Sequence, residues 1–524
     1  MLKSEETALV VKNKDKPADN ESTLKNSILL RTGAFGLNGM FFAAHLLLNG
    51  KYLSMLGTDG AAASSLMSTY QSVILGSCVG GLLGTGLDFG KAVGERKYIE
   101  AGAVVKTASI LALALGGVSA SAMMSTRIIF PLLFPEGPAE LASDFFTGYA
   151  AASWPLLFLI VAPQVAFQEG EWYIPPGSMF AVFTTSGIVS YLLGFQTNLG
   201  ALGIGLGGTI GSSLSALTIG AWFIKKNYSK YRLYNPRIEN FMPKLKSLLA
   251  SGWKLSLQRF LEWGNLLAIT TIVGFDSSQD LEALNPSMLY LTLFGTTFQG
   301  FAAAAGMIIF RNKGAIQKAL ESHNNIEING HHKNNIQTLF RSSFFGASLS
   351  TVIFATFYLA RKPFTELFLS EDVPEDTLEL AETLLWINML GLIPDSCRII
   401  TSGALRGWKE LLYPTLISFL LMTVIGVPAA YGLSIFWGDE SENMVSIRDI
   451  TILISTLLIF SRSYINVKKD ERELREHIEP TSFFKTGLSL WGNKKEGKII
   501  EVDVNDTQIN YVDEEEQNAG FSNS

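Results

Sequence analysis

The chain has 524 residues, of which 48% are hydrophobic and only 17% are charged. Soluble domains carry about 25% charged residues, so this composition is typical of a membrane protein. The net charge of −6 arises largely in a polar tail after Asn466, and no basic footprint of the kind that binds nucleic acid is present in the sequence. Cys78 and Cys397 both fall in apolar segments, which argues against a disulfide framework.

Residues 1–27 lack the apolar core and the cleavage pattern of a secretory signal peptide. We expect a disordered cytoplasmic arm there, and a polar, acidic cytoplasmic tail over 467–524 with a short charged helix near 468–478. Between these ends lie twelve apolar segments long enough to span a bilayer, which takes about 20 residues. They are 28–50, 61–86, 99–122, 144–167, 176–196, 200–224, 253–275, 286–310, 339–360, 380–404, 411–436 and 448–466.

Loop charge alternates along this series, as the positive-inside rule requires for cytoplasmic termini. The loops after the sixth and eighth segments are basic, whereas those after the seventh, ninth and eleventh are acidic. Only the short loop 168–174, with Glu169 and Glu171 and no Lys or Arg, disagrees. We therefore predict twelve spans with both ends in the cytoplasm.

The chain divides into two related halves. A basic cytoplasmic linker, 226–250, separates six spans (28–225, the N-lobe) from six more (251–466, the C-lobe). A constant offset of 239 residues aligns residues of the two halves: Ala142 with Ala381, Pro155 with Pro394, Pro175 with Pro414 and Phe180 with Phe419. Because each half has an even number of spans, both enter the membrane in the same sense. The sequence thus predicts an all-α polytopic membrane protein of two six-helix lobes, with pseudo-two-fold symmetry along the membrane normal.

Three spans carry polar residues along one face. The tenth has Asn388, Asp395 and Ser402 every seven residues, with Arg398 on the same face. Such faces point into a bundle or a wet cavity, since lipid cannot satisfy them. The seventh and first spans repeat the pattern: Gln258, Arg259, Glu262 and Asn265 in the seventh, and Arg31, Asn38, His45 and Asn49 in the first.

Two interpretations of these faces remain open. Arg259 with Glu262, and Arg398 with Asp395, are i,i+3 pairs that could simply neutralise each other as structural contacts. Alternatively, the acids belong to a site that binds a coupling ion. His45 is similarly open between a satisfied core residue and a functional one.

The tenth span also carries a recognisable pattern. Leu405-Arg406-Gly407 begins ten residues after Asp395, and Trp408, Lys409 and Pro414 follow. This looks like the signature of the MATE (multidrug and toxic compound extrusion) transporters. The seventh span, with Phe260-Leu261-Glu262-Trp263, resembles the glutamate-bearing span of the family's NorM-like and eukaryotic branches. The resemblance covers roughly residues 28–466.

The resemblance implies a secondary active antiporter that exports organic compounds, cationic or amphipathic ones among them, in exchange for H⁺ or Na⁺ by alternating access. It implies no cofactor and a monomer in the bacterial inner (plasma) membrane. Glu262 and Asp395 match the family's coupling acids, and Na⁺ could bind their oxygens. The candidate cavity residues are Arg259, Asn265, Asn388, Arg398, His45, Asn38 and Gln258. The sequence departs from the family pattern where Arg259 and Arg398 add positive charge beside both acids.

Two other classes of function compete with efflux. A flippase for lipid-linked or anionic lipid substrates of the wider superfamily would use Arg259 and Arg398 to bind headgroups. A membrane enzyme is not indicated, because the spans lack HExxH, GxSxG and Walker patterns. The glycine-rich stretch 200–211 opens a span without a preceding strand, so it is interpreted as a helix-packing surface.

Overall fold

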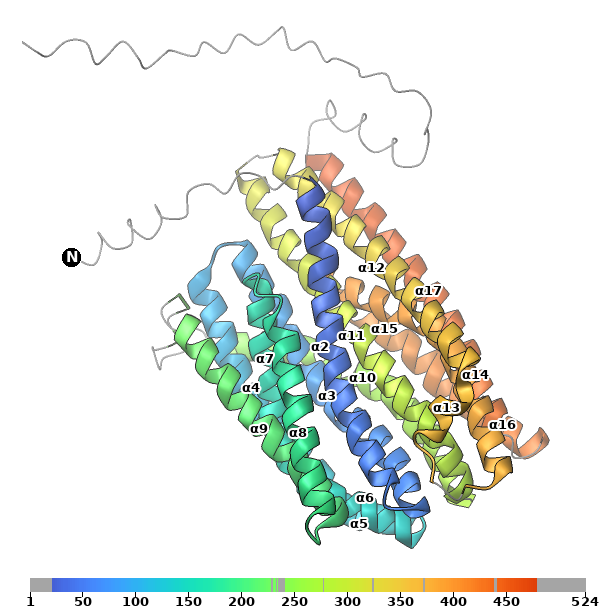
Figure 1. Cartoon of the computed structure of the whole chain (residues 1–524). Helices are drawn as coiled ribbons and strands as arrows, with labels where there is room; N and C mark the ends of the chain where they lie inside the picture. Colours follow the sequence, from blue (N-terminus) through green and yellow to red (C-terminus); the bar gives the residue numbers. More distant parts are fainter. Residues whose placement is uncertain are drawn as a thin grey trace, which may run out of the picture. The chain divides into compact units, whose positions relative to one another are not determined.

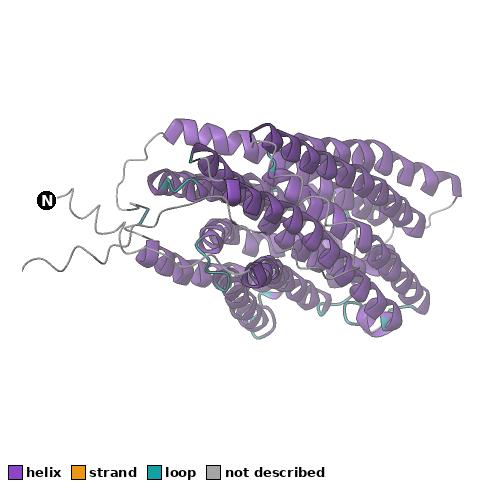
Figure 2. Ribbon diagram, turned by 90° about the horizontal axis from the view of Figure 1, so that it is seen from above, coloured by secondary structure: helices purple, strands orange, loops and turns teal. Residues whose placement is uncertain are grey.

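The computed structural model describes residues 21–227, 230, 231, 233, 241–276, 278–322, 325–370, 373–437 and 441–477. These residues form helices, and Figure 2 shows no strand among them. Residues up to Asp470 make one compact unit. Of the second unit, which starts at Glu471, only residues 471–477 are described, as the end of a helix.

The first half contains the helices coloured blue to green in Figure 1. They are α2 (Glu21–Ser54), α3 (Thr58–Gly94), α4 (Tyr98–Met124), α5 (Thr126–Leu133), α6 (Glu136–Tyr149), a 3₁₀ turn η1 (Ala150–Ala152), α7 (Ser153–Gln168), α8 (Ile174–Phe195) and α9 (Gly200–Asn227). Helix α2 therefore starts within the segment expected to be a disordered arm, whose first 20 residues lie outside the described part.

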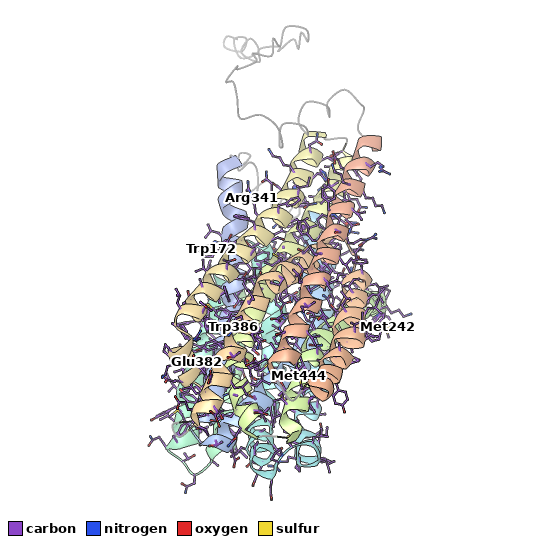
Figure 3. All side chains as sticks on the ribbon, turned by 90° about the vertical axis from the view of Figure 1, so that its right-hand side faces the viewer. Trp172, Met242, Arg341, Glu382, Trp386 and Met444 are labelled. Carbon is purple, nitrogen blue, oxygen red and sulfur yellow. The ribbon has the colours of Figure 1, made fainter. Side chains whose placement is uncertain are left out.

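The second half contains the yellow-green to red helices. They are α10 (Phe241–Asp276), α11 (Ser278–Glu321), α12 (Asn325–Leu359), α13 (Arg361–Glu366), α14 (Glu375–Gly407), α15 (Leu412–Ile417), a π-helix η2 (Ser418–Gly426), α16 (Val427–Trp437) and α17 (Ser441–His477). Helix α17 continues past residue 466, where the last span was predicted to end, and includes residues 468–477 of the segment expected to form a short charged helix. Figure 3 faces this half, with Glu382 and Trp386 on α14 and Met444 on α17.

Ten helical segments in the described part of the chain are long and apolar enough to cross a membrane. Each overlaps one predicted span. The other two predictions, 28–50 and 253–275, lie on α2 and α10, which are not among the ten, so the count of twelve is not matched exactly. The reason is chemical: the polar residues that mark these two helices as candidate sites also lower their mean hydropathy.

The offset of 239 residues is visible in the structure. The fourth and tenth spans, Glu136–Gln168 and Glu375–Gly407, begin and end at related positions. Pro135 and Pro374, also related, precede them with nearly equal dihedral angles, φ −55° and −59°, ψ 148° in both. Each span follows a short helix, α5 or α13.

The turns that end these two spans also match. Gly170 and Lys409, again 239 apart, have positive φ of 85° and 63°. In the next position, the amide of Glu171 donates to Ala166 O, and that of Glu410 donates to Leu405 O, at the related acceptor. This backbone pattern is the left-handed end of a helix, which satisfies its last carbonyl groups. The two halves therefore share local geometry as well as element order.

Contacts between loops explain the one loop that disagreed with the charge pattern. Glu169 pairs with Lys230, and Glu171 pairs with Lys226, so the acidic loop 168–174 is neutralised by the basic segment after the sixth span. Arg311, from the end of the eighth span, donates to Gln168 O at 3.0 Å. The ends of the fourth, sixth and eighth spans thus lie on one side, as the predicted topology requires.

The two halves meet mainly through α2 and α3 from the first and α10 and α11 from the second. Glycine allows the closest approaches. A Cβ atom on Gly80 would meet the backbone of Leu255 and Ser256, and one on Gly300 would meet the backbone of Phe35. These interfaces frame the cavities described next.

Candidate functional site

A buried ion-pair cluster joins α10 to α14. Arg398 donates from Nε to Asp395 Oδ1 at 2.7 Å, and from Nη1 to Glu262 Oε1 at 2.9 Å. Its guanidinium group therefore bridges the two predicted coupling acids across two helices. The side chain of Arg398 is 3% exposed, that of Glu262 6% and that of Asp395 11%. In such a setting an ion pair is screened little by solvent.

Glu262 is the most heavily bonded member of the cluster. Besides Arg398, its Oε1 accepts from Gln258 Nε2 at 2.9 Å, and its Oε2 accepts from Arg259 Nη1 at 3.1 Å. The stretch Gln258 to Glu262 presents all three groups because positions i, i+1 and i+4 share one face of a helix. Both oxygens of Glu262 are thus occupied by donors, so a cation would have to compete with guanidinium groups for them.

Two predicted site residues lie elsewhere. Asn388 donates to Leu384 O and accepts from Arg448 Nη1 at 2.6 Å. Asn265 donates to Met422 O at 2.7 Å, within the π-helix η2. Neither amide contacts Glu262 or Asp395 among the hydrogen bonds of the described residues. Each amide therefore links its helix to another element, Asn265 to η2 and Asn388 to α17, rather than bonding to the ion-pair cluster.

His45 belongs to a separate network that contains no Asp, Glu, Lys or Arg among its hydrogen-bond partners in the described residues. Its Nε2 atom lies 3.2 Å from the Tyr149 hydroxyl and 3.4 Å from Asn49 Nδ2. His45 and Asn49 are fully buried. Asn38, the other predicted residue of the first span, instead lines the large cavity between the two halves. The structure therefore divides the predicted residues into an ion-pair cluster, a cavity and an isolated histidine network.

The large cavity has a volume of about 830 Å³ and is lined by residues of both halves. Its walls are mostly apolar, and its polar side chains include Asn38, Gln71, Gln164, Arg259 and Gln299. Arg259 thus faces this cavity while also binding Glu262. A second cavity, of about 390 Å³, is lined by Glu262, Asp395, Arg398 and Arg448. Glu262, Asp395 and Arg398 therefore line the second cavity, and Arg259, which binds Glu262, lines the large cavity.

Sequence reasoning missed three charged residues at this site. Arg448 and Asp449 lie on α17, 3.5 Å apart, with side chains that are 5% and 15% exposed. Both residues lie at the start of the predicted last span, where charged residues are common, so they did not stand out in the sequence. Arg406 was seen only as part of a motif, although it is fully buried at the end of α14. In the described residues no group of three or more His, Cys, Asp and Glu side chains could hold a metal ion.

The fold and this site describe a multi-pass membrane protein with a buried charged cluster and a cavity between its two halves. The MatE family model matches residues 327–432. Two curated relatives, each named "Probable multidrug resistance protein NorM", come from Deinococcus radiodurans and Bradyrhizobium diazoefficiens. The first is 24% identical over 328 residues, covering 60% of this chain and 68% of the relative. The second is 23% identical over 401 residues, covering 74% and 81%.

Solved structures show the same fold. A eukaryotic MATE transporter, AtDTX14, superposes with a TM-score of 0.72 at 16% identity, covering 87% of this chain and 98% of that one. A MOP superfamily transporter from Pyrococcus furiosus gives 0.71 at 16% identity, covering 85% and 96%. The chain thus carries a MatE match within its second half and is similar, at low identity, to NorM-like transporters of the MATE family.

Proposed function

We propose that this chain exports organic compounds in exchange for H⁺ or Na⁺ by alternating access. The observation that carries this proposal is the bridge that Arg398 makes between Glu262 on α10 and Asp395 on α14, both in the second half. The relatives named as multidrug resistance proteins support export of drug-like molecules. The cavity supports it too, since its walls are mostly apolar and carry a few polar side chains, as in pockets that bind small organic molecules.

In the proposed mechanism, the coupling ion competes with Arg398 for its carboxylates. A proton or Na⁺ that binds Asp395 or Glu262 weakens the bond to the guanidinium group. Arg398 would then be a buried charge without full compensation, which is costly. That free energy favours a different packing of α14, and a substrate that binds one packing better than the other completes the coupling.

Transport in proteoliposomes tests the proposal. Glu262→Gln and Asp395→Asn keep shape and remove charge, and each should fold yet lose gradient-driven export of a cationic dye. Glu382→Gln is the matched control, because Glu382 lies on α14 but pairs with Arg361 at the surface. Wild-type rates in either site variant would show that the residue does not couple. Comparison of a pH gradient with a Na⁺ gradient identifies the ion.

A second candidate is transport of an anionic substrate or an anionic lipid. It is favoured by the surplus of buried arginine, with Arg259 at the wall of the large cavity. The Pyrococcus furiosus transporter is itself described as having a binding pocket of reverse polarity, which suggests a different function for that protein. A panel of cationic and anionic dyes of similar size separates the two candidates. Export of the cationic dyes supports the first candidate. Export of the anionic dyes supports the second, because the buried arginines attract anions.

We further propose a bacterial inner-membrane monomer with both termini in the cytoplasm. The loop contacts support the relative sidedness, and the positive-inside rule supports the orientation. Cysteine introduced at Lys230 should resist a membrane-impermeant label in intact cells, whereas cysteine at Asp280 should react, in a background without Cys78 and Cys397. The opposite labelling pattern would invert the proposed topology.

A further inference from the structure

Arg406 is a buried cation without a matching anion. It lies at the end of α14, where Gly403 and Gly306 bring α14 against α11, and its side chain is 3% exposed. Its Nε and Nη1 atoms have no hydrogen-bond partner among the described residues. A buried charge of this kind is unfavourable unless something pairs with it. The position therefore calls for a ligand that accepts hydrogen bonds.

Gln164 faces the same place from the other half of the molecule. It lies on α7, is 3% exposed, and neither atom of its amide has a partner in the described part of the chain. Gln164 and Arg406 line one small cavity, whose other walls are apolar, with Leu83, Leu87 and Met307 among them. The cavity admits about one water-sized particle. Two unpartnered polar side chains thus share a space of the size of a small ion.

The charges nearby leave a deficit of one anion. Three buried guanidinium groups, Arg259, Arg398 and Arg406, accompany two buried carboxylates, Glu262 and Asp395. Arg448 and Asp449 add one charge of each sign and do not change the balance. One bound monovalent anion would neutralise the cluster.

We infer that Arg406 and Gln164 bind a chloride-sized anion at the interface between the two halves. The guanidinium N–H groups and the Gln164 amide N–H group donate to it, and both side chains gain the partners that they lack. This site is separate from the proposed exchange of H⁺ or Na⁺ at Glu262 and Asp395, and it stands or falls independently of the coupling ion.

Binding of radioactive chloride to the purified full-length chain in detergent tests the inference. Arg406→Met should abolish binding. Gln164→Leu should weaken it about tenfold, the value of a hydrogen bond to a charged group. The controls are Arg462→Met, because Arg462 is already paired with Glu410, and Gln168→Leu, because Gln168 lies one helical turn away and donates to Met307 O. Both controls should bind as wild type does.

Thermal unfolding gives a second readout that does not depend on transport. Replacing chloride with gluconate at constant ionic strength should lower the Tm of the wild type and of both controls, and should leave that of Arg406→Met unchanged. Without chloride, Arg406→Met should be at least as stable as wild type, because it removes a buried unpaired charge. The inference is overturned if wild type binds no chloride, or if binding survives in both site variants. If Arg406→Met does not fold, wild-type affinity in Gln164→Leu overturns it alone.

Discussion

The fourth and tenth spans, Glu136–Gln168 and Glu375–Gly407, share their ends and differ in their middles. At the positions of Asp395 and Arg398, the first half carries Leu156 and Leu159. Where the tenth span has Asn388, the fourth has Tyr149, which contacts His45. The two spans therefore share the backbone geometry of their ends, but the middle of the fourth span is apolar and the middle of the tenth carries buried charges. The charged residues are therefore specific to the second half and are not part of what the two spans share.

Replacing the charged residues of the tenth span with the leucines of the fourth should have the largest effect on stability. Arg398→Leu leaves Asp395 buried without its cation and removes one donor to Glu262, so we expect a loss of about 3–5 kcal/mol in the free energy of unfolding. The double variant Asp395→Leu/Arg398→Leu should recover most of that loss, because Glu262 keeps Arg259. Thermal unfolding in detergent measures both. Equal stability of the single and double variants would mean that the pair is not coupled.

The next effect concerns close packing in the tenth span, where Gly403 corresponds to Gln164 of the fourth. A Cβ atom at Gly403 would meet the backbone of Ala302 on α11. Gly403→Ala should therefore lower stability by about 1–3 kcal/mol through overpacking. Gly264→Ala is the control, since a Cβ there meets nothing within 4 Å. A neutral Gly403→Ala would show that α11 and α14 can separate without cost.

The histidine network of the first half should respond more weakly. Tyr149→Phe removes the hydroxyl that lies 3.2 Å from His45 Nε2, and the expected loss is about 1 kcal/mol. The dependence of transport on the ion gradient should stay as in wild type. A changed dependence on the gradient would indicate that the histidine network takes part in coupling, contrary to the contrast between the halves.

The smallest effects are expected where the two halves agree. Glu171 and Glu410 occupy related positions and pair with Lys226 and Arg462 respectively. The hydrogen bond from Lys226 lowers the pKa of Glu171, and that from Arg462 lowers the pKa of Glu410. Each pair therefore contributes stability above about pH 5, and the contribution is lost as pH falls through the lowered pKa.

Glu171→Gln and Glu410→Gln should each cost less than about 1 kcal/mol at neutral pH, since both pairs are partly exposed. The difference from wild type should shrink on acidification, as followed by thermal unfolding between pH 7 and about pH 4. A difference that grows at low pH would contradict the assigned direction of the pKa shifts.

The sequence determined the class of fold, the halves and their repeat, because these depend on local properties. Hydropathy over about 20 residues predicts a span wherever it lies. Residues that recur at a constant offset of 239 mark related positions in the two halves. The acids Glu262 and Asp395, and the arginines beside them, were also visible, since charge within an apolar helix is conspicuous at any position.

Only the tertiary structure decided which of these residues belong together. Arg398 follows Asp395 by one turn, yet its second partner, Glu262, is 136 residues away in the sequence. Asn265 and Asn388 share helices with the acids but contact Met422 and Arg448, because helix rotation and packing direct their side chains to other neighbours. Arg406 and Gln164 lie in different halves and have no common motif. Their shared cavity exists only because the close packing of α14 against α11 fixes a long side chain at the interface, and no local pattern encodes such a distance.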